Sequence, residues 1–511
     1  MAKGTLDTAG RAWEVSFAGA AAPLVLALDI GSTASRGAFF DAHGRPVGGR
    51  VKIPHAFSSS SDGTSEIDAD QVLSEITEII DRLVQAHGEG GGPAIGGVAL
   101  DSFASSMVLV DAERAALAPA ATYADSRPHE YVDVLRSEIA EAELHQRVGT
   151  RIHTSYWPAR LRWLQARRPE LVSRTASYLS LGDYVLEKLT GTIGTGTSSA
   201  AWTGMVDLRT ADWSDEVLEL SGIVRDALPP VHHLDQPYEI AASHAARIAE
   251  RWPALALASW FAPIPDGLAA NVGLGAADER TIGGTAATSG ALRVLVRELP
   301  AELPGGLWCY RVSHDRALVG GALNDVGRAM AWASSSLAHD ARDDGGLETD
   351  PLLAAPSGST PLVLPFFTGE RSTGWAANAR AVFAGVDAST TGPAMLRGVA
   401  EGIAISYGRI LGQLRELAPQ AAALHIGGSV TADYPAMLQI ISDVLELPLT
   451  PVTIKRSTLL GNALLALETV APGVERIRPA HTTPLEPATS RSGYYRDRVG
   501  RFEETYAQLF G

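Results

Sequence analysis

Apolar and polar residues at the start of the chain follow a pattern that predicts a β-hairpin. Residues 24–30 (LVLALDI) and 34–40 (ASRGAFF) are strand-length segments with apolar runs, separated by a Gly-Ser-Thr turn. We expect a third strand before residue 57. Residues 70–87 then show helical spacing, with apolar side chains recurring every three to four positions. Strand and helix signals continue to alternate, which is typical of α/β architecture.

The same periodicity predicts further elements and leaves two segments without a regular pattern. Residues 338–360 are rich in Asp, Gly and Ser and are expected to form a loop or insertion. Residues 1–22 lack the basic-then-apolar order of a signal peptide, so we expect a loosely ordered extension. The expected helices cover residues 130–143, 157–168, 213–221, 241–252, 267–275 and 494–509.

Turns made of small residues recur after later strands. Segment 283–296 (GGTAATSGALRVLV) repeats the order of small-residue loop and apolar strand found at 29–40, and Gly427 and Gly428 follow another short strand. This weak internal echo predicts two related halves with a boundary near 274–282. We therefore expect an extension, an N-terminal domain, a C-terminal domain and a helical tail, with the bounds 1–22, 23–276, 277–480 and 481–511.

Composition narrows the class of protein. A chain of 511 residues exceeds what one hydrophobic core usually supports, so two large domains are expected. The net charge of −16 argues against nucleic acid or an anionic membrane as the main partner, although a local positive pocket could still bind an anionic substrate. Cys309 is the single cysteine, which rules out a disulfide framework and favours the cytoplasm. No apolar run reaches membrane-spanning length, so no membrane span is expected.

The turn between the first two strands has the composition of a phosphate-binding loop. Gly31 imposes no Cβ clash, and Ser32 and Thr33 supply donors. Asp29, at the end of the first strand, could serve a Mg²⁺ ion bound to that phosphate, directly or through water. An ordinary hairpin turn is the alternative interpretation. The two later small-residue turns favour ATP binding, and the absence of a GxxxxGK[ST] sequence excludes a P-loop enzyme.

At this point the chain resembles a known family, the FGGY carbohydrate kinases of the actin-like ATPase superfamily. Within that family it is most similar to gluconate kinases, on residues 145–171 and 318–327, with xylulose kinases next. The resemblance implies an α/β fold of two actin-like (ribonuclease H-like) domains flanking a central cleft. The matching motifs are LALDIGSTASRG, TYADSR at 122–127, PDGLAANVGLG at 265–275, ATSGALR at 287–293, FTGERS at 367–372 and the segment 425–445 that begins HIGGSV.

The resemblance implies that Asp266 is the catalytic base. A carboxylate beside the sugar hydroxyl would orient it and accept its proton during phosphoryl transfer. Asp29 and Asp266 would both lie near Mg²⁺. Without the resemblance, an N-cap role would be the favoured interpretation of Asp266. The chain departs from the family pattern at Pro265 and Ala287, where a small residue and a glycine are usual.

Binding residues are implied by the same motifs. Structural alternatives are a surface ion pair for Asp125 and Arg127, a packed side chain for His153, and an ion-pair role for the turn 369–372. The expected nucleotide-binding residues are Asp29, Gly31, Ser32, Thr33, Arg36, Thr288, Ser289, Gly290, Gly427, Gly428, Ser429, Gln439 and Asn462. The expected sugar-binding residues are Ser105, Met107, Asp125, Arg127, His153, Asp266 and Asn271.

The sequence thus predicts an ATP- and Mg²⁺-dependent kinase that phosphorylates a terminal hydroxyl of a small sugar or sugar acid. Gluconate is the first choice of substrate, with 6-phosphogluconate as product. A xylulose, other pentulose or polyol kinase is the alternative within the class. A non-catalytic sugar-responsive protein, and a chaperone-like or filament-forming ATPase, are alternatives from other classes, although segments 98–107 and 122–127 argue against the last. ATP and the sugar are the expected partners, and a homodimer is possible.

Overall fold

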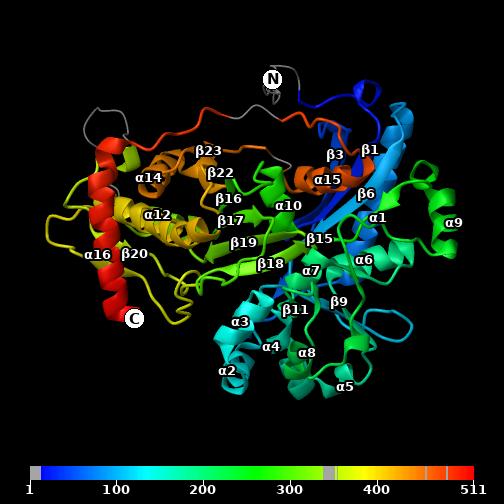
Figure 1. Cartoon of the computed structure of the whole chain (residues 1–511), viewed down its shortest axis with the longest axis horizontal. Helices are drawn as coiled ribbons and strands as arrows, with labels where there is room; N and C mark the ends of the chain where they lie inside the picture. Colours follow the sequence, from blue (N-terminus) through cyan, green and yellow to red (C-terminus); the bar gives the residue numbers. More distant parts are fainter. Residues whose placement is uncertain (1–12, 338–350, 354, 455–456, 479–481, 511) are drawn as a thin grey trace. The chain divides into compact units, whose positions relative to one another are not determined.

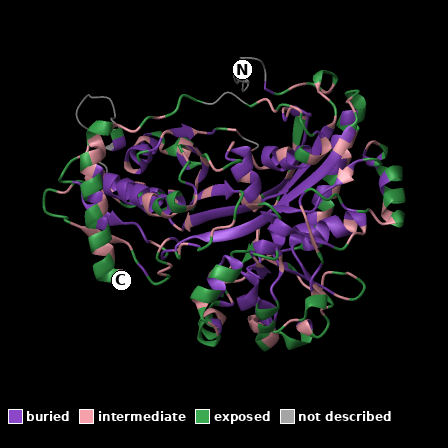
Figure 2. Cartoon of the chain, viewed as in Figure 1, coloured by how far each residue is buried: buried purple, intermediate pink, exposed green. Residues whose placement is uncertain are grey.

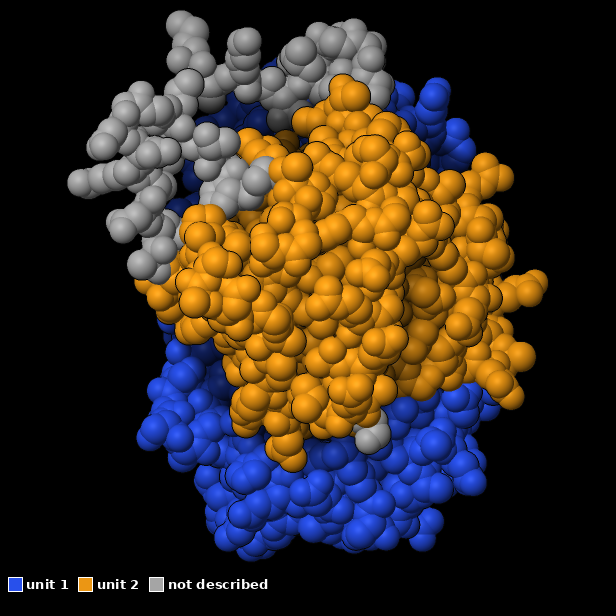
Figure 3. Space-filling view, turned by 90° about the vertical axis from the view of Figure 1, so that its left-hand side faces the viewer, with its two compact units in different colours: residues 1–273, 309–318, 456–480 blue, residues 274–308, 319–455, 481–511 orange. Residues whose placement is uncertain are grey.

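Two compact units make up the chain, and each is built from separate stretches of sequence (Figures 1 and 3). Our computed structural model describes residues 13–337, 351–353, 355–454, 457–478 and 482–510. Most of the expected loop at 338–360 lies outside these residues. Unit 1 comprises Met1–Gly273, Cys309–Leu318 and Arg456–Ala480, and unit 2 comprises Leu274–Trp308, Val319–Lys455 and His481–Gly511.

Unit 1 is organised around a sheet whose first two strands flank the predicted phosphate turn. The predicted hairpin and third strand are confirmed, because β1, β2 and β3 form an antiparallel meander. Strand β6 pairs in parallel with β1, and β14 and β15 both pair in parallel with β6. The strand order is β14 (Ser259–Trp260), β6 (Ile95–Ser102), β1 (Leu24–Ile30), β2 (Ala34–Phe40) and β3 (Pro46–Pro54), with β15 (Ile264–Pro265) beside the end of β6.

Two helices from opposite ends of the chain pack on this sheet. Helix α1 (Ala69–Glu89) covers β2 and β3 with its buried apolar residues, as its helical spacing predicts. Helix α15 (Ser457–Val470) contacts β1 and β6 although it comes near the end of the sequence. It therefore belongs to unit 1, whereas the sequence pattern led us to expect residues 277–480 in one C-terminal domain.

Helix α15 also crosses α10 (Asp266–Gly273) at unusually short range. A Cβ on Gly461 would lie 1.8 Å from the carbonyl oxygen of Ala269, and one on Gly273 would lie 1.7 Å from that of Ser457. Only glycine fits at such a crossing, since any side chain would overlap the backbone of the other helix. The contact fixes α10, and with it Asp266, against the helix that packs on β1.

The rest of unit 1 consists of short elements. The expected helix at 130–143 is interrupted, because Ile139 takes an extended backbone between α2 and α3. The helices are α2 (His129–Glu138), α3 (Glu141–Val148), α4 (Trp157–Arg167), α5 (Pro169–Val172), α6 (Leu181–Thr190), α7 (Thr197–Ala201), α8 (Asp215–Ser221) and α9 (Ala242–Arg251). The short strands are β4 (Ser58–Ser59), β5 (Ser65–Ile67), β7 (Val108–Val110), β8 (Ala120–Ala121), β9 (Ser177–Leu179), β10 (Thr195–Gly196), β11 (Val206–Asp207), β12 (Asp212–Trp213) and β13 (Val231–His232).

Residues 13–22 are better ordered than the loose extension expected from the sequence. Trp13 is buried, and Val15 forms a β-bridge with Val47. The ring of Phe17 contacts the rings of Phe39 and His87. Burial of these aromatic side chains stabilises residues 13–22, although their sequence has no regular apolar spacing.

Unit 2 repeats the arrangement of a sheet covered by helices. Strands β16 and β17 pair antiparallel and β22 joins β16 in parallel. The order is β19 (Arg316–Leu323), β17 (Gly290–Val296), β16 (Thr281–Ala286), β22 (Ala423–Gly427) and β23 (Leu449–Pro451). All of β18 (Trp308–Ser313) except Trp308 belongs to unit 1, as do residues 316–318 at the start of β19. Strand β20 (Leu362–Leu364) pairs with β21 (Val382–Ala384). The helices are α11 (Gly327–Ser336), α12 (Gly392–Leu417), α13 (Val430–Asp433), α14 (Pro435–Leu445) and α16 (Ser492–Phe510).

Burial follows the same plan in both units. Figure 2 shows the main strands in the buried colour, whereas α16 keeps an exposed face. The predicted C-terminal helix is confirmed as α16. The buried Glu401 of α12 forms ion pairs with Arg397 of the same helix and with Arg498 of α16, so it joins the two helices. No helix in the described part of the chain is long and apolar enough to cross a bilayer.

Candidate active site

Two aspartates stand side by side at the end of the unit 1 sheet. Asp29 is the penultimate residue of β1, and the parallel register places Asp101 of β6 directly beside it. Both are buried, with 2% and 0% of their surface exposed. Within the described residues, neither carboxylate oxygen of Asp101 accepts a hydrogen bond from a donor group. A buried carboxylate without donors is costly as an anion.

Asp266 completes a cluster of three carboxyl groups. Strand β15 pairs with β6 so that Pro265 lies opposite Ser102, and Asp266 follows as the first residue of α10. Burial, the neighbouring Asp29 carboxylate and then Asp266 hold the pKa of Asp101 well above its usual range. Protonated Asp101 can donate to Asp29, which removes the repulsion between two adjacent anions.

The turn after β1 is closed by a backbone hydrogen bond, and the guanidinium of Arg36 lies beside Asp29. Gly31 N donates to Ala34 O at 3.1 Å. The guanidinium of Arg36 donates to Asp29 Oδ2 at 2.8 Å, and a Cβ on Gly31 would lie only 2.5 Å from Arg36 Nη1. Thr33 is exposed and Ser32 is half-buried. The predicted residues of this turn therefore lie together, and Gly31 leaves room for the end of the Arg36 side chain.

The two later small-residue turns are also adjacent, in unit 2. Strands β16 and β22 run parallel with Thr285 beside Gly427. A Cβ on Gly428 would lie 2.2 Å from the carbonyl oxygen of Ala286, so the two turns meet at backbone distance. The start of α11 joins them, since Gly327 N donates to Ala287 O at 2.7 Å. The exposed residues at these turns are Thr288, Ser289, Gly428 and Ser429.

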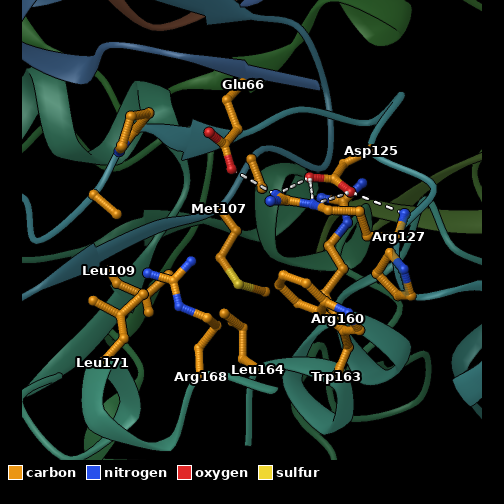
Figure 4. Close-up of a pocket in the computed structure, with 14 residues that line it drawn as sticks. Glu66, Met107, Leu109, Asp125, Arg127, Arg160, Trp163, Leu164, Arg168 and Leu171 are labelled. Atoms are coloured by element: carbon orange, nitrogen blue, oxygen red, sulfur yellow. Dashed lines mark hydrogen bonds and ion pairs between the residues drawn. The ribbon is translucent and has the colours of Figure 1, made fainter. Parts of the chain in front are cut away.

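A pocket in unit 1 contains the aspartate–arginine pair of the TYADSR segment (Figure 4). Arg127 Nε donates to both carboxylate oxygens of Asp125 at 3.0 Å, and its Nη2 donates to Glu66 Oε1 at 2.6 Å. Its guanidinium also lies 4.6 Å from the centre of the Trp163 ring. Arg127 thus balances two carboxylates and stacks on an aromatic face. The lining, which includes Met107 and Arg160, does not include the three aspartates.

Comparison with known proteins accounts for both units. Residues 24–255 match the N-terminal domain of the FGGY family of carbohydrate kinases, and residues 285–469 match its C-terminal domain. The chain belongs to this family. It is an ATP-dependent carbohydrate kinase with the α/β fold expected from the sequence.

Its relatives include kinases for different substrates. The chain is 24% identical to a gluconokinase of Bacillus subtilis (strain 168) over 457 residues, which cover 87% of each protein. It is 23% identical to a xylulose kinase of Lactococcus lactis subsp. lactis (strain IL1403) over 449 residues, covering 86% of this chain and 87% of the relative. The crystal structure of gluconate kinase from Lactobacillus acidophilus aligns with a TM-score of 0.84 at 22% identity, over 95% of this chain and 98% of that one.

Two of the predicted nucleotide-binding residues of this FGGY kinase, Gln439 and Asn462, form side-chain hydrogen bonds with other residues of the chain. Gln439 on α14 donates to Asp443 and to the carbonyl oxygen of Glu486. Asn462 lies on α15 in unit 1 and donates to the carbonyl oxygen of Leu28, at 3.1 Å. This bond joins α15 to the strand that carries Asp29. Their nucleotide roles stay predictions.

The predicted sugar-binding residues are dispersed over unit 1. Ser105 has a positive φ of 58°, and its hydroxyl donates to Trp202 O at 2.6 Å. Met107 is fully buried in the Figure 4 pocket, and Asn271 is fully buried on α10. His153 Nδ1 accepts from Ser155 N at 3.1 Å. Asp125 and Arg127 form an ion pair that is largely buried, unlike the surface pair of the structural alternative. Asp266 is the remaining member, and all these sugar-binding roles stay predictions.

Sequence reasoning missed Asp101 and Arg160. The segment GVALDS ends a strand with Leu-Asp, as LALDIG does, so Asp101 could have been recognised as a parallel neighbour of Asp29. Arg160 is buried, with Nε donating to Thr154 O at 3.0 Å and Nη1 donating to Ser105 O. No local signal distinguished it, because arginine is common on solvated helix faces.

Proposed function

We propose that this FGGY kinase transfers the γ-phosphoryl group of ATP to the terminal hydroxyl of gluconate, giving 6-phosphogluconate. The observation that carries the proposal is the convergence of Asp29, Asp101 and Asp266 at the ends of β1, β6 and β15. The gluconokinase relative supports the choice of substrate. An acidic cluster of this kind is suited to handling a proton and a phosphate-bound cation.

Asp266 is the general base in this proposal. Its carboxylate orients the substrate hydroxyl and accepts its proton as the oxygen bonds to the γ-phosphorus and the bond to ADP breaks. Asp266 is half-buried at the start of α10, and the α10–α15 glycine crossing restrains that helix. A restrained base loses less freedom when the substrate is bound.

Asp29 and Asp266 would hold Mg²⁺, and the small-residue turns would hold the nucleotide. In the described part of the chain, no three His, Cys, Asp or Glu side chains are grouped so that they could hold a metal ion. Mg²⁺ is usually bound by one or two carboxylates together with water and substrate phosphates, so the proposal needs only these two aspartates. The exposed donors are of a kind that binds phosphate oxygens, at Thr33 in unit 1 and at Thr288, Ser289 and Ser429 in unit 2. ATP would supply the phosphoryl group.

An assay of ADP release over a panel of sugars, polyols and aldonic acids tests the proposal. Gluconate should give the highest kcat/KM. Asp266→Ala should lower kcat by at least about 10²-fold, because the proton acceptor is lost, while ATP affinity stays nearly unchanged. Activity within tenfold of wild type would reject Asp266 as the base. ADP release without any sugar would indicate an ATPase instead.

A xylulose, other pentulose or polyol kinase is the second candidate. If the substrate is an aldonic acid, Arg127 is the first candidate to bind its carboxylate. It already pairs with Asp125 and Glu66. A site whose arginine is balanced by two carboxylates is better suited to a neutral substrate than to another anion. The same panel separates the candidates, since a neutral ketose or polyol would then exceed gluconate. A homodimer stays a prediction.

A further inference from the structure

His55 contacts two backbone carbonyl groups of the predicted phosphate turn. It follows β3, and its side chain is fully buried. Ring atom Nε2 lies 2.7 Å from the carbonyl oxygen of Gly31, and the backbone N of His55 donates to the carbonyl oxygen of Thr33 at 3.1 Å. One residue therefore holds the carbonyl groups at both ends of the Gly31–Thr33 turn.

The contact with Gly31 sets the direction of a neighbouring donor. In a trans peptide the C=O of one residue and the N–H of the next point in opposite directions. Because the Gly31 carbonyl points at the His55 ring, the N–H of Ser32 points to the other side of the turn. Rotating this peptide plane would turn the Ser32 donor away from that side.

The imidazole is itself fixed by α1. Ring atom Nδ1 lies 2.8 Å from Glu75 Oε2, a carboxylate with 6% of its residue surface exposed. Ser35 Oγ donates to the same oxygen at 2.7 Å, and Gln71 Nε2 donates to Glu75 Oε1 at 2.9 Å. Both ring nitrogens therefore face acceptors, and a carboxylate on one side orients the ring for its bond on the other.

We propose that His55 is a positioning residue for nucleotide binding. It holds the Gly31–Ser32 peptide so that the Ser32 N–H faces the terminal phosphates of ATP, and Glu75 holds the ring that does so. This inference rests on the proposed role of the Gly31–Thr33 turn in phosphate binding. His55 itself touches neither substrate.

Two near-isosteric variants separate the two ring bonds. The amide nitrogen of Gln in His55→Gln falls near the Nε2 position and can still donate to Gly31 O. The amide nitrogen of Asn in His55→Asn falls near the Nδ1 position and reaches only Glu75. We expect His55→Asn to bind MgATP about 3- to 10-fold more weakly, the cost of one lost hydrogen bond, whereas His55→Gln stays within about twofold of wild type.

The measurement is calorimetric or thermal-shift titration of the whole chain with MgATP and, separately, with AMP. AMP lacks the β- and γ-phosphates, so its affinity should be the same in all variants. His87→Gln is the matched control. His87 is another buried histidine of unit 1, with Nε2 2.9 Å from Pro93 O, and its loss should affect stability but not MgATP affinity.

Several outcomes would overturn the positioning role of His55. Equal MgATP affinity in His55→Asn and wild type, or equal losses for Asn and Gln, would overturn the positioning role. Parallel losses for MgATP and AMP would also overturn it, because they would indicate general damage. If His55→Asn does not fold, Glu75→Ala replaces it, and unchanged MgATP affinity there overturns the proposal. Wild-type protein that binds neither nucleotide would refute the proposed function instead.

Discussion

Gly428 has a backbone φ of +116°, and a Cβ there would lie 2.2 Å from the carbonyl oxygen of Ala286. The turn that follows β22 can therefore approach the turn that follows β16 only with glycine at this position. At residue scale, the two predicted nucleotide turns of unit 2 depend on the absence of one side chain.

Gly428→Ala should separate the two turns and lower MgATP affinity by at least about tenfold, because both backbone strain and a steric overlap oppose the native geometry. Titration with MgATP gives the affinity, and circular dichroism checks that the variant is folded. Gly412→Ala is the matched control in unit 2, since a Cβ on this helical glycine would meet nothing within 4 Å. Wild-type affinity in the folded Gly428→Ala variant would contradict the role of this turn.

Arg127 is the residue at which the two proposed substrate classes differ most. If gluconate is the substrate, removing the guanidinium in Arg127→Ala should raise KM for gluconate more than KM for a neutral polyol, because a carboxylate loses more than a hydroxyl. Steady-state kinetics on both substrates measures the difference. Equal losses on both would mean that the arginine serves only to hold Asp125 and Glu66 in place.

At the scale of elements, the periodic segments were predictable and the close contacts were not. Apolar spacing sufficed for the hairpin, for α1 and for α16, since each presents a regular apolar face. The short strand β15 has no such pattern, yet its pairing with β6 brings Asp266 to Asp101. The family resemblance implied that Asp29 and Asp266 lie near one Mg²⁺ ion. Spacing along one segment cannot report the register between two strands, so the pairing that adds Asp101 to them was taken from the structure.

Helix α6 contains a buried acid that makes stability depend on pH. Asp183 forms a capping box with Ser180, and burial raises its pKa from 3.8 to about 7. Between these values the unfolded chain has released the proton and the folded chain retains it, so this group makes the free energy of unfolding fall as pH rises. Above about pH 7 both states are ionised and the loss is complete.

Asp183→Asn should remove this dependence, because the amide stays neutral and can still accept from Ser180. Denaturant unfolding at about pH 5, 6, 7 and 8 should show the variant gaining on wild type as pH rises, with a plateau above about pH 7. Parallel curves for the two proteins would show that Asp183 titrates normally in the folded state.

At the scale of the whole molecule, the sequence predicted two large units, but it did not indicate which late segments pack with the first of them. The predicted boundary near 274–282 adjoins the break after Gly273. Residues 309–318 and α15, however, return to unit 1. Composition and periodicity describe neighbours along the chain, whereas these returns are decided by packing of distant segments, such as the fit of Gly461 against Ala269.

The late position of α15 has a consequence for how the protein is made. Strands β1 and β6 emerge from the ribosome within the first 102 residues, but the helix that packs on them begins at Ser457. During most of synthesis the apolar face that α15 covers has no partner in the nascent chain, and exposed apolar surface of this kind promotes aggregation. Unit 1 is therefore completed after unit 2 has largely been synthesised, and a fragment ending at Gly273 would lack the helix that closes its sheet.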